Sequence, residues 1–540
     1  MANMSSMASM SNMANVIADP SSVPESAYVV RNEVPPEMIA ASLQALLPTR
    51  RHAIATRRFT LLDTFDGRVR RAGARLTRGG PACATVNWQS RHGRHVSTRV
   101  KQAPRFVWDL PDGPLHEEMA SVVGVRRLIA KAEAEEHGSL LEILDGEGKT
   151  VARLRVASGR ARLPISRSAW QPLPTVVTLS ALRGYEDAYA RLVPLILSRP
   201  GIERCPEGLD GVILRQVGVR EPLDVASLRL DMPSSVRADV GARQIHRAIA
   251  DILLANEAGV RERLDTEFLH DFRVALRRTR SLLGQIRDVF PAAAVERFSS
   301  EFSWIGRLTG PPRDLDVLLL ALRGPIEDVD ARDLRALTTV LEDARGQEQV
   351  RLDEALASAR YRRLLSEWQT FLNRPSDASG TANGVRPLAD VISERAWRLS
   401  RRIARGADAV DGRSTADELH AVRIAAKKLR YLVDITPGFY EAADLEHILV
   451  ALKKLQRVLG EFNDAEVQKR RLIDCTGALA ASGARPAVLV AVGRLAERSR
   501  ERREHARGQI VDGLVRFRDR ETRSALRRAF RKASSEGLRG

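Results

Sequence analysis

Residues 269–283 read LHDFRVALRRTRSLL, and residues 419–433 read LHAVRIAAKKLRYLV. Each stretch holds a Leu-His pair, an Arg three residues after the His, an Ala, two adjacent cations and a further Arg. Equivalent residues lie 150 positions apart, as His270 and His420 do (420 − 270 = 150). Self-similarity at a fixed offset is the signature of an internal repeat. The chain is therefore expected to contain two related halves.

Each stretch is expected to form a helix with an apolar face beside a cationic one. At about 100° per residue, His270, Arg273, Arg277 and Arg280 fall within about 80° of one another. The adjoining apolar stripe consists of Leu269, Phe272, Leu276 and Leu283, repeated as Leu419, Val422, Ala426 and Val433. Like charges three or four residues apart oppose helix formation. A bound polyanion would offset that repulsion.

The charge balance also points to an anionic partner. Lys and Arg number 86 against 68 Asp and Glu, a net charge of +18 over 540 residues. This excess favours nucleic acid, a phosphate polymer or lipid headgroups, without choosing among them. Cys83, Cys205 and Cys475 are too scattered for a disulfide framework, which favours a reducing compartment. No apolar run approaches the ~18 residues of a membrane span and no signal peptide is evident, so the expected location is cytoplasmic.

Changes in composition and hydrophobic pattern divide the chain into four parts. Residues 1–25 are expected to be a disordered leader, 26–220 an α+β domain, 221–235 a linker, and 236–540 an all-α domain. The Gly-rich and Pro-rich stretch 374–387 splits the last part into halves of about 236–373 and 387–540.

Several elements are expected in the α+β domain. A helix is predicted at 38–47, two strands around a turn at Asp66-Gly67 within 57–78, and a helix at 115–134. Residues 140–144 and 151–156 flank DGEGK and predict a hairpin, which is favoured over a phosphate-binding loop at Gly148-Lys149-Thr150. Residues 170–174 are expected to be a loop, and residues 183–185 are expected to open a helix that runs through Leu197.

The repeat extends beyond the cationic stretch. Its further members are Arg307, Gly310, Asp314 and Val317, which recur as Arg457, Gly460, Asp464 and Val467. Each Asp stands 44 residues after its His (314 − 270 and 464 − 420), so each half is expected to pair a His/Arg helix with a helix beginning near the Asp. Thr415 and Glu418 form a capping-box pattern that predicts a helix start near Ala416. Two similar four-helix bundles about a pseudo-twofold axis are the predicted architecture.

The segments LHDFRVALRRTR, LHAVRIAAKKLRY, RDLDVL and NDAEV resemble the CHAD family, the conserved histidine α-helical domain. The resemblance covers about residues 236–540 and includes the His of both halves. It implies non-catalytic binding of inorganic polyphosphate in a cationic pore or cleft between the bundles, and association with polyphosphate granules. The low aromatic content, 5%, fits a ligand that has no bases to stack.

The preceding domain resembles a degenerate CYTH domain, the tunnel-type β-barrel that binds triphosphates. Leu61-Leu62-Asp63-Thr64, Gly73, Arg75, Arg78 and residues 182–185 carry this likeness. The family's Glu-x-Glu-x-Lys signature should lie near residues 28–37, where Glu33 alone cannot supply the metal-binding carboxylate pair. Triphosphatase or cyclase activity is therefore not expected. Arg75 and Arg78 are interpreted either as anion ligands or as solvated strand residues.

The predicted polyphosphate-binding residues are the repeated cations and histidines. They are His270, Arg273, Arg277, Arg278, Arg280 and Arg307, with His420, Arg423, Lys427, Lys428, Arg430 and Arg457; Asp314 and Asp464 are expected to support them.

Other interpretations stay open at this point. Each histidine could instead bond a neighbouring carboxylate, such as Asp314 or Asp464. No catalytic residue, cofactor or metal site is predicted, since His92 and His95 lie in a loop without a third ligand. A metal-dependent triphosphate hydrolase and a nucleic-acid-binding protein are the alternative functions, and the oligomeric state is left open.

Overall fold

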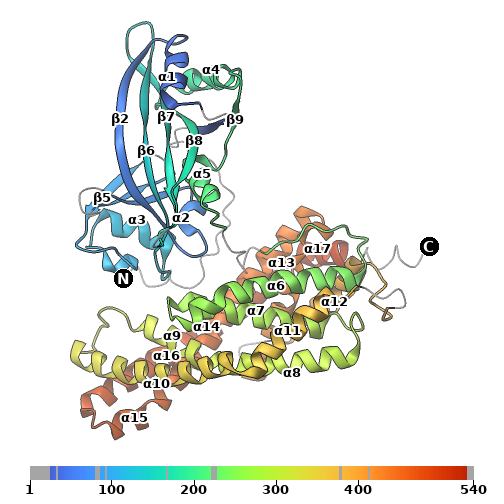
Figure 1. The fold of residues 1–540 in the computed structure, drawn as a ribbon. Helices are drawn as coiled ribbons and strands as arrows, with labels where there is room; N and C mark the ends of the chain where they lie inside the picture. Colours follow the sequence, from blue (N-terminus) through green and yellow to red (C-terminus); the bar gives the residue numbers. More distant parts are fainter. Residues whose placement is uncertain are drawn as a thin grey trace. The chain divides into compact units, whose positions relative to one another are not determined.

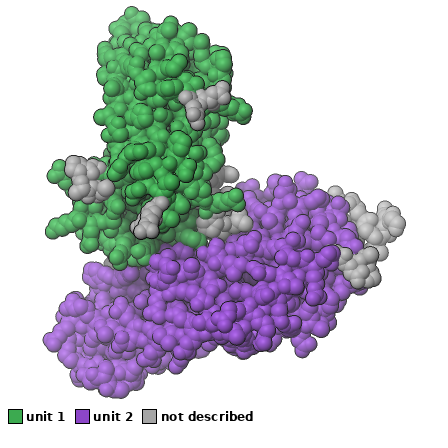
Figure 2. Space-filling model, viewed as in Figure 1, with its two compact units in different colours: residues 1–222 green, residues 223–540 purple. Residues whose placement is uncertain are grey.

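The computed structural model describes residues 25–31, 34–79, 85–91, 94–165, 168–220, 228–375, 380–410 and 414–531 (Figure 1), apart from the side chains of Ala416 and Arg518. The chain divides into two compact units, Met1–Pro222 and Leu223–Gly540 (Figure 2). Residues 1–24 of the predicted leader, Glu33, Cys83, His92 and residues 221–227 of the predicted linker lie outside the described residues. None of the described helices is long and apolar enough to cross a membrane.

The first unit is built on an antiparallel sheet. Its described strands are β1 (Glu25–Val30), β2 (Thr49–Asp63), β3 (Arg75–Gly79), β4 (Thr85–Gln89), β5 (His95–Arg99), β6 (Ile129–Leu144), β7 (Thr150–Arg162), β8 (Gln171–Ala181) and β9 (Ile202–Arg204). They pair in the order β5-β4-β3-β2-β6-β7-β8-β1-β9. The predicted α+β class is confirmed and is consistent with a CYTH-like domain. Closure of the sheet into a barrel stays a prediction.

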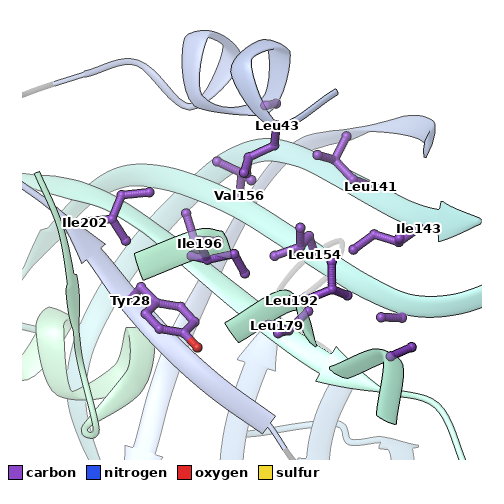
Figure 3. Packing of buried hydrophobic residues seen from close by; sticks show 14 of the residues in the cluster. Tyr28, Leu43, Leu141, Ile143, Leu154, Val156, Leu179, Leu192, Ile196 and Ile202 are labelled. Atoms are coloured by element: carbon purple, nitrogen blue, oxygen red, sulfur yellow. The ribbon is translucent and has the colours of Figure 1, made fainter. Parts of the chain in front are cut away.

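Short helices cover the two faces of this sheet. They are α1 (Pro36–Gln44), α2 (Arg68–Arg71), η2 (Val107–Asp109), α3 (Pro114–Val123), α4 (Glu186–Leu197) and α5 (Gly208–Gln216). Leu43 of α1 and Leu192 and Ile196 of α4 pack on Leu141 and Leu154 of the long central strands (Figure 3). Toward the other end of β6, α5 packs through Val212, Ile213 and Leu214 on the buried Ala132 and Ala134.

The predicted helix at 115–134 is wrong beyond Val123. Gly124, with φ at 60°, follows the last helical residue, and the chain becomes strand β6 from Ile129. Ala132 and Ala134 are buried while Lys131 and Glu133 are half-buried, which is the period-two pattern of a strand. Alanine favours helices intrinsically, so the tertiary setting of this segment overrides its propensity.

The connections between strands of the first unit match the predictions in part. The hairpin is confirmed, since β6 pairs with β7 and Asp145 Oδ1 accepts hydrogen bonds from the N–H groups of Glu147 and Lys149, both at 2.9 Å. The two strands expected around Asp66-Gly67 are confirmed as the antiparallel pair β2 and β3, although helix α2 follows the turn before β3 begins. The expected loop at 170–174 enters strand β8 at Gln171.

The Leu-Asp-Thr segment at the end of β2 builds that turn. The Asp63 carboxylate accepts hydrogen bonds from the N–H groups of Thr64 (2.7 Å), Val69 (2.8 Å) and Arg70 (3.1 Å). Burial nevertheless raises the pKa of Asp63. Asp63, one of the residues on which the CYTH resemblance rests, therefore holds the backbone of this turn.

The second unit is helical, as predicted. Its helices are α6 (Ala238–Arg261), α7 (Thr266–Gln285), α8 (Ala292–Leu308), α9 (Gly310–Ala321), α10 (Ala331–Ala357), α11 (Ala359–Asn373), α12 (Leu388–Ala409), α13 (Ala416–Ile435), η3 (Pro437–Phe439), α14 (Ala442–Asp474), α15 (Thr476–Ala481), α16 (Pro486–Arg518) and α17 (Arg520–Arg531). Their grouping into two four-helix bundles stays a prediction.

The two halves meet where α6 and α12 begin. Arg237 and Pro387 form an antiparallel β-bridge, in which the N–H of Ala238 donates to the carbonyl of Arg386 and the N–H of Leu388 donates to the carbonyl of Val236, both at 2.8 Å. Residues 237 and 387 are 150 positions apart. Because an antiparallel bridge has local twofold symmetry, it relates equivalent points of the repeat as a pseudo-twofold axis would.

The halves differ around the repeated Asp. In the first half α8 ends at Leu308 and α9 begins at Gly310, close to Asp314 as expected. In the second half the expectation is wrong, since Asp464 lies inside the continuous 33-residue helix α14. Gly310 is followed by two prolines, whereas Gly460 is followed by Glu and Phe. A proline lacks the N–H donor and clashes with the preceding turn, which explains why only the first half is interrupted.

A buried histidine lies in the aromatic core of the first half. His246 of α6 is fully buried, with ring centroids 5.1 Å from Trp368 and 6.1 Å from Phe290. Within the described residues neither ring nitrogen has a hydrogen-bond partner. Burial lowers the pKa of His246 to about 3. The folded state therefore requires the neutral imidazole.

We expect His246 to make the helical unit sensitive to acid. Because the folded pKa lies below the ordinary value of 6.5, the folded unit has full stability above that pH and loses about 1.4 kcal/mol per pH unit below it. His246→Leu should reduce this loss between pH 6.5 and pH 4.5, as measured by urea unfolding followed by circular dichroism. An unchanged pH dependence in the variant would show that other groups cause the loss.

Candidate functional site

Helix caps fix the position of both cationic helices along the chain. At the start of α7, the Asp265 carboxylate accepts hydrogen bonds from the N–H groups of Glu267 (2.8 Å) and Phe268 (3.2 Å). The predicted start of α13 at Ala416 is confirmed, since the Thr415 hydroxyl and the Glu418 carboxylate cap each other's backbone N–H. The apolar stripe of each helix is buried. Caps and stripe together determine which cations face the other half.

Four cations from the two helices form what we call the central cluster. It consists of Arg273 and Arg277 of α7 with Arg423 and Lys427 of α13, which are equivalent in pairs through the repeat. Helices α7 and α13 pack against each other, and all four side chains are half-buried. Equivalent residues of the two halves thus lie close enough for their charges to act on one another.

Burial and mutual repulsion change the acidity of the cluster. Burial, reinforced by the charges of Arg423, Arg277 and Arg273, lowers the pKa of Lys427 to about 7, against the opposing charge of Asp464. Burial is also the main cause that lowers the pKa of Arg423 and of Arg273. A lysine that is only partly charged at neutral pH marks a site where positive charge is in excess.

The protein satisfies only part of this cluster. Arg273 Nη1 donates to the carbonyl of Gly306 (3.1 Å) and to Thr309 Oγ1 (3.2 Å), and Arg423 Nη2 lies 3.9 Å from Asp464 Oδ1. The Nε atoms of Arg277 and Arg423 are buried and have no hydrogen-bond partner among the described residues. Buried guanidinium donors usually have acceptors, so the arrangement leaves capacity for an anion.

The two supporting aspartates have different surroundings. Asp314 Oδ2 accepts a hydrogen bond of 3.1 Å from Arg471 Nη2, which ties α9 to α14 across the halves. Its charge raises the pKa of Arg273 and so opposes the effect of burial. The side chain of Asp464 is 66% exposed beside Arg423. Each Asp therefore offsets part of the positive charge, and neither neutralises the cluster.

Of the other predicted cations, Arg280 acts on the central cluster through its charge, which contributes to the lowered pKa of Arg273. Arg280 and Arg307 are exposed, and the charge of Arg307 adds to burial in lowering the pKa of Arg280. Arg457 Nη1 lies 3.0 Å from Glu461 Oε1. Arg430 is held by Asp434 at 3.1 Å and by the Gln456 amide oxygen at 3.0 Å.

Two predicted cations face other surroundings. Arg278 is buried, its guanidinium 5.6 Å from the ring centroid of Tyr431 and its Nη2 atom 3.9 Å from Asp434 Oδ2. Burial, with the charges of Arg395, Arg402 and Arg287, lowers the pKa of Lys428. These three arginines and Lys428 form a second cationic group, which we call the α12 cluster.

The two repeated histidines each precede the cluster by one helical turn. His270 is half-buried and His420 is exposed. Within the described residues no hydrogen bond joins His420 to Asp464, the carboxylate considered as its partner.

Some residues of the site have no signal in the repeat. Arg471 aligns with Ala321 and Arg313 with Asn463 at the offset of 150, so neither is duplicated. Arg313 donates to the carbonyl of Thr266 at 2.9 Å, and its charge contributes to the lowered pKa of Arg273. The chain has 86 basic residues, so an arginine that is not duplicated cannot be recognised as a site residue from the sequence.

In the first unit, Arg75 of the CYTH-like resemblance is paired, whereas the buried Nε of Arg78 has no hydrogen-bond partner among the described residues. Arg75 Nε lies 2.9 Å from Asp210 Oδ1, and its guanidinium lies 4.9 Å from the ring centroid of Phe59. Glu136 is buried between Arg57 (2.9 Å) and Arg155 (2.5 Å). Burial raises the pKa of Glu136, but the charges of Arg155, Arg75 and Arg57 outweigh burial and hold it below the usual value. These ion pairs therefore offset part of the positive charge on this face.

Sequence comparison identifies the helical module. Residues 244–473 match the family model of the CHAD domain. Two uncharacterised proteins of Mycobacterium tuberculosis, from strains CDC 1551 / Oshkosh and ATCC 25618 / H37Rv, are 25% identical over 242 residues, which cover 43% of this chain and 45% of each relative. The match thus spans less than half the length of these curated relatives.

Two solved structures are also similar to this chain. The crystal structure of the CHAD domain from the plant Ricinus communis is 27% identical, covers 54% of this chain and 96% of that chain, and has a TM-score of 0.46. PptA from Streptomyces chartreusis is 18% identical, covers 52% and 99%, and has a TM-score of 0.40.

The second unit is thus an all-helical module that gathers cations from two repeated halves. Residues 244–473 are a CHAD domain, and that family is associated with polyphosphate binding.

We expect Arg277→Met to stabilise the ligand-free protein. The substitution removes one of four mutually repelling cations and leaves the apolar part of the side chain in place, which should add about 1 kcal/mol and raise the Tm by about 2–4 °C. Arg457→Met, which removes a charge paired with Glu461, is the matched control and should not raise the Tm. A lower Tm for Arg277→Met than for the wild type would mean that attractive contacts of Arg277 outweigh repulsion.

Proposed function

We propose that the central cluster binds inorganic polyphosphate, and that the protein acts as a non-catalytic binder which associates with polyphosphate granules in the cytoplasm. The observation that carries the proposal is the convergence of Arg273, Arg277, Arg423 and Lys427 at the packing of α7 on α13. The CHAD domain match over residues 244–473 supports the same ligand class.

Polyphosphate fits the chemistry of this cluster. Its chain carries closely spaced negative charges without bases or side groups to be recognised. Arginine forks bind phosphate oxygens through parallel N–H donors, and lysine adds a point charge. The buried Nε donors of Arg277 and Arg423 would find acceptors in such a ligand. Ligand charge would also relieve the repulsion among the four cations.

The remaining predicted residues extend the proposed binding surface. We assign the outer part to Arg280, Arg307 and Arg457 with His270 and His420, and the support of the cluster to Asp314 and Asp464. Lys428 would contact a chain that continues toward the α12 cluster. Arg278 and Arg430, which are held by Asp434, position α13 rather than the ligand.

Nucleic acid fits the site less well. Binding of single strands without sequence preference relies on aromatic rings that stack on the bases. Tyr431 is the aromatic residue of the repeated stretches nearest to the cations, and the guanidinium of Arg278 lies against its ring.

Removing Arg273 and Arg423 together should abolish binding of long-chain polyphosphate. The double variant Arg273→Gln/Arg423→Gln loses one fork from each half, and we expect at least a hundredfold weaker binding in fluorescence anisotropy or calorimetry. Affinity of the wild type should fall steeply with salt. The matched control Arg351→Gln/Arg500→Gln removes the same charge at exposed pairs with Glu348 and Glu497 and should bind normally.

Competition separates the two polyanions. Single-stranded DNA at equal phosphate concentration should fail to displace polyphosphate from the wild type. Displacement by DNA would refute specificity for polyphosphate, and undiminished binding by the double variant would refute the assignment of the site.

Binding should strengthen as the pH falls through 7. An anion favours the charged form of Lys427, whose pKa is about 7 in the free protein, so binding takes up a proton. The surrounding charges are Arg273 and Arg277 on α7, Arg423 on α13 and Asp464 on α14. We expect about tenfold tighter binding at pH 6 than at pH 8.

Lys427→Arg tests this proton uptake. Arginine keeps its charge across the range, so the variant should keep only the weaker pH dependence that His270 and His420 contribute. Equal pH dependence in Lys427→Arg and the wild type would show that Lys427 is not the titrating group.

A further inference from the structure

A second cluster of ligating side chains lies where α14 meets the corner between α16 and α17. His447 belongs to α14, Asp519 connects α16 to α17, and Glu521 lies in the first turn of α17. One ligand atom from each residue lies within 4.8 Å of the other two. We propose that these three residues bind one first-row divalent transition-metal ion, with Zn²⁺ as the reference metal. This proposal goes beyond polyphosphate binding and does not depend on it.

The donor set suits such a metal. Imidazole and carboxylate ligands are typical of zinc and its neighbours, whereas calcium and magnesium prefer oxygen ligands alone. Bonds of about 2.1 Å place ligand atoms about 3–4 Å apart in tetrahedral or octahedral geometry. The present spacing is close to this range, and Asp519 and Glu521 are exposed, so small side-chain rotations complete the geometry. Three protein ligands leave at least one position for water.

A second residue fixes the imidazole. His447 Nε2 lies 3.0 Å from the hydroxyl of Thr522, which is fully buried. For metal binding, Nε2–H donates to the Thr522 hydroxyl, which orients the ring and leaves Nδ1 as the ligand atom. Thr522 follows Glu521 directly, and therefore one turn of α17 supplies both a ligand and the residue that orients another ligand.

The two carboxylates lack the partner that other acids nearby have. Asp408 pairs with Arg523 at 2.8 Å, and Asp444 accepts hydrogen bonds from Arg528 Nε at 3.1 Å. Among the ion pairs of the described residues, none includes Asp519 or Glu521. The charge of Arg528 acts on Glu521 from a distance, but its hydrogen bonds go to Asp444.

Within the described part of the chain, Asp519 is bonded to both helices through its backbone alone, which leaves its carboxylate available. Its N–H donates to the carbonyl of Val515, and its carbonyl accepts from the N–H of Arg523, both at 3.1 Å. In a chain of net charge +18, two adjacent carboxylates beside a histidine and without arginine partners are suited to hold a cation of another kind.

The site belongs to one half of the repeat. His447 aligns with Arg297 at the offset of 150, and Arg297 pairs with Glu367. A bound ion would join α14 to the α16–α17 corner, and its binding energy would add to the stability of the second half.

Zinc titration of the full-length, chelator-treated protein tests the proposal. We expect one Zn²⁺ per chain at micromolar concentration, a rise in Tm at saturation, and Co²⁺ absorption bands that report imidazole and carboxylate ligation. Asp519→Asn and Glu521→Gln preserve size and hydrogen bonding but weaken ligation, so each should lower zinc affinity at least tenfold. Polyphosphate binding should remain normal in both variants, which separates this proposal from the proposed function.

Two further variants make the test specific. His447→Gln can keep a hydrogen bond to Thr522 while losing the strongest ligand, and it should abolish the Co²⁺ bands. His52→Gln is the matched control, because His52 contacts Glu142 at 3.2 Å and belongs to no group of three possible ligands in the described residues. Absence of stoichiometric zinc binding, or zinc binding that survives in Asp519→Asn/Glu521→Gln, would overturn the proposal.

Discussion

The helical unit depends on holding like charges together between α7 and α13. Arg273, Arg277, Arg423 and Lys427 repel one another, and burial removes the water that would screen them. Apolar burial opposes this cost, because Leu269, Phe272 and Leu276 with their repeat equivalents anchor both helices in the core. The same apolar residues that stabilise the fold therefore set the phase of the cationic faces. The position of the cationic faces in this unit is a consequence of packing.

The two halves are symmetric at the proposed binding site and differ elsewhere. The central cluster takes two cations from each half, whereas the prolines after Gly310, the Asp314–Arg471 pair and the α12 cluster occur once. The pair between Asp314 and Arg471 crosses from one half to the other and needs no counterpart. Duplicated positions thus define the proposed binding site, and single positions adjust how the halves are held.

Sequence reasoning succeeded where a pattern is local or repeated. The repeat, the helical class, the cap at Thr415 and the hairpin at Asp145 follow from spacing and from side chains that bond their own backbone. The prediction failed at residues 129–134, because alanines that alternate with Lys131 and Glu133 fit a helix as well as a strand until pairing with the neighbouring strands selects the strand. The repeat predicted the same role for Arg277 and Arg278. Successive residues of a helix point about 100° apart, however, and Arg278 lies against the ring of Tyr431. Arg471 and Arg395 could not be identified, since only the fold reveals which of many arginines face the site.

The bridge between Arg237 and Pro387 has a consequence for the origin of the chain. An antiparallel bridge joins two identical segments as readily as two different ones, so the same pair of hydrogen bonds could form between separate copies of a single half. When the two halves are fused, their association is intramolecular, so the interface forms with one copy of each half at any protein concentration. Fusion also lets each copy mutate alone, as the uninterrupted α14 opposite the broken α8 and α9 illustrates. The helical unit can be described as two related halves that hold a dimer-like interface within one chain.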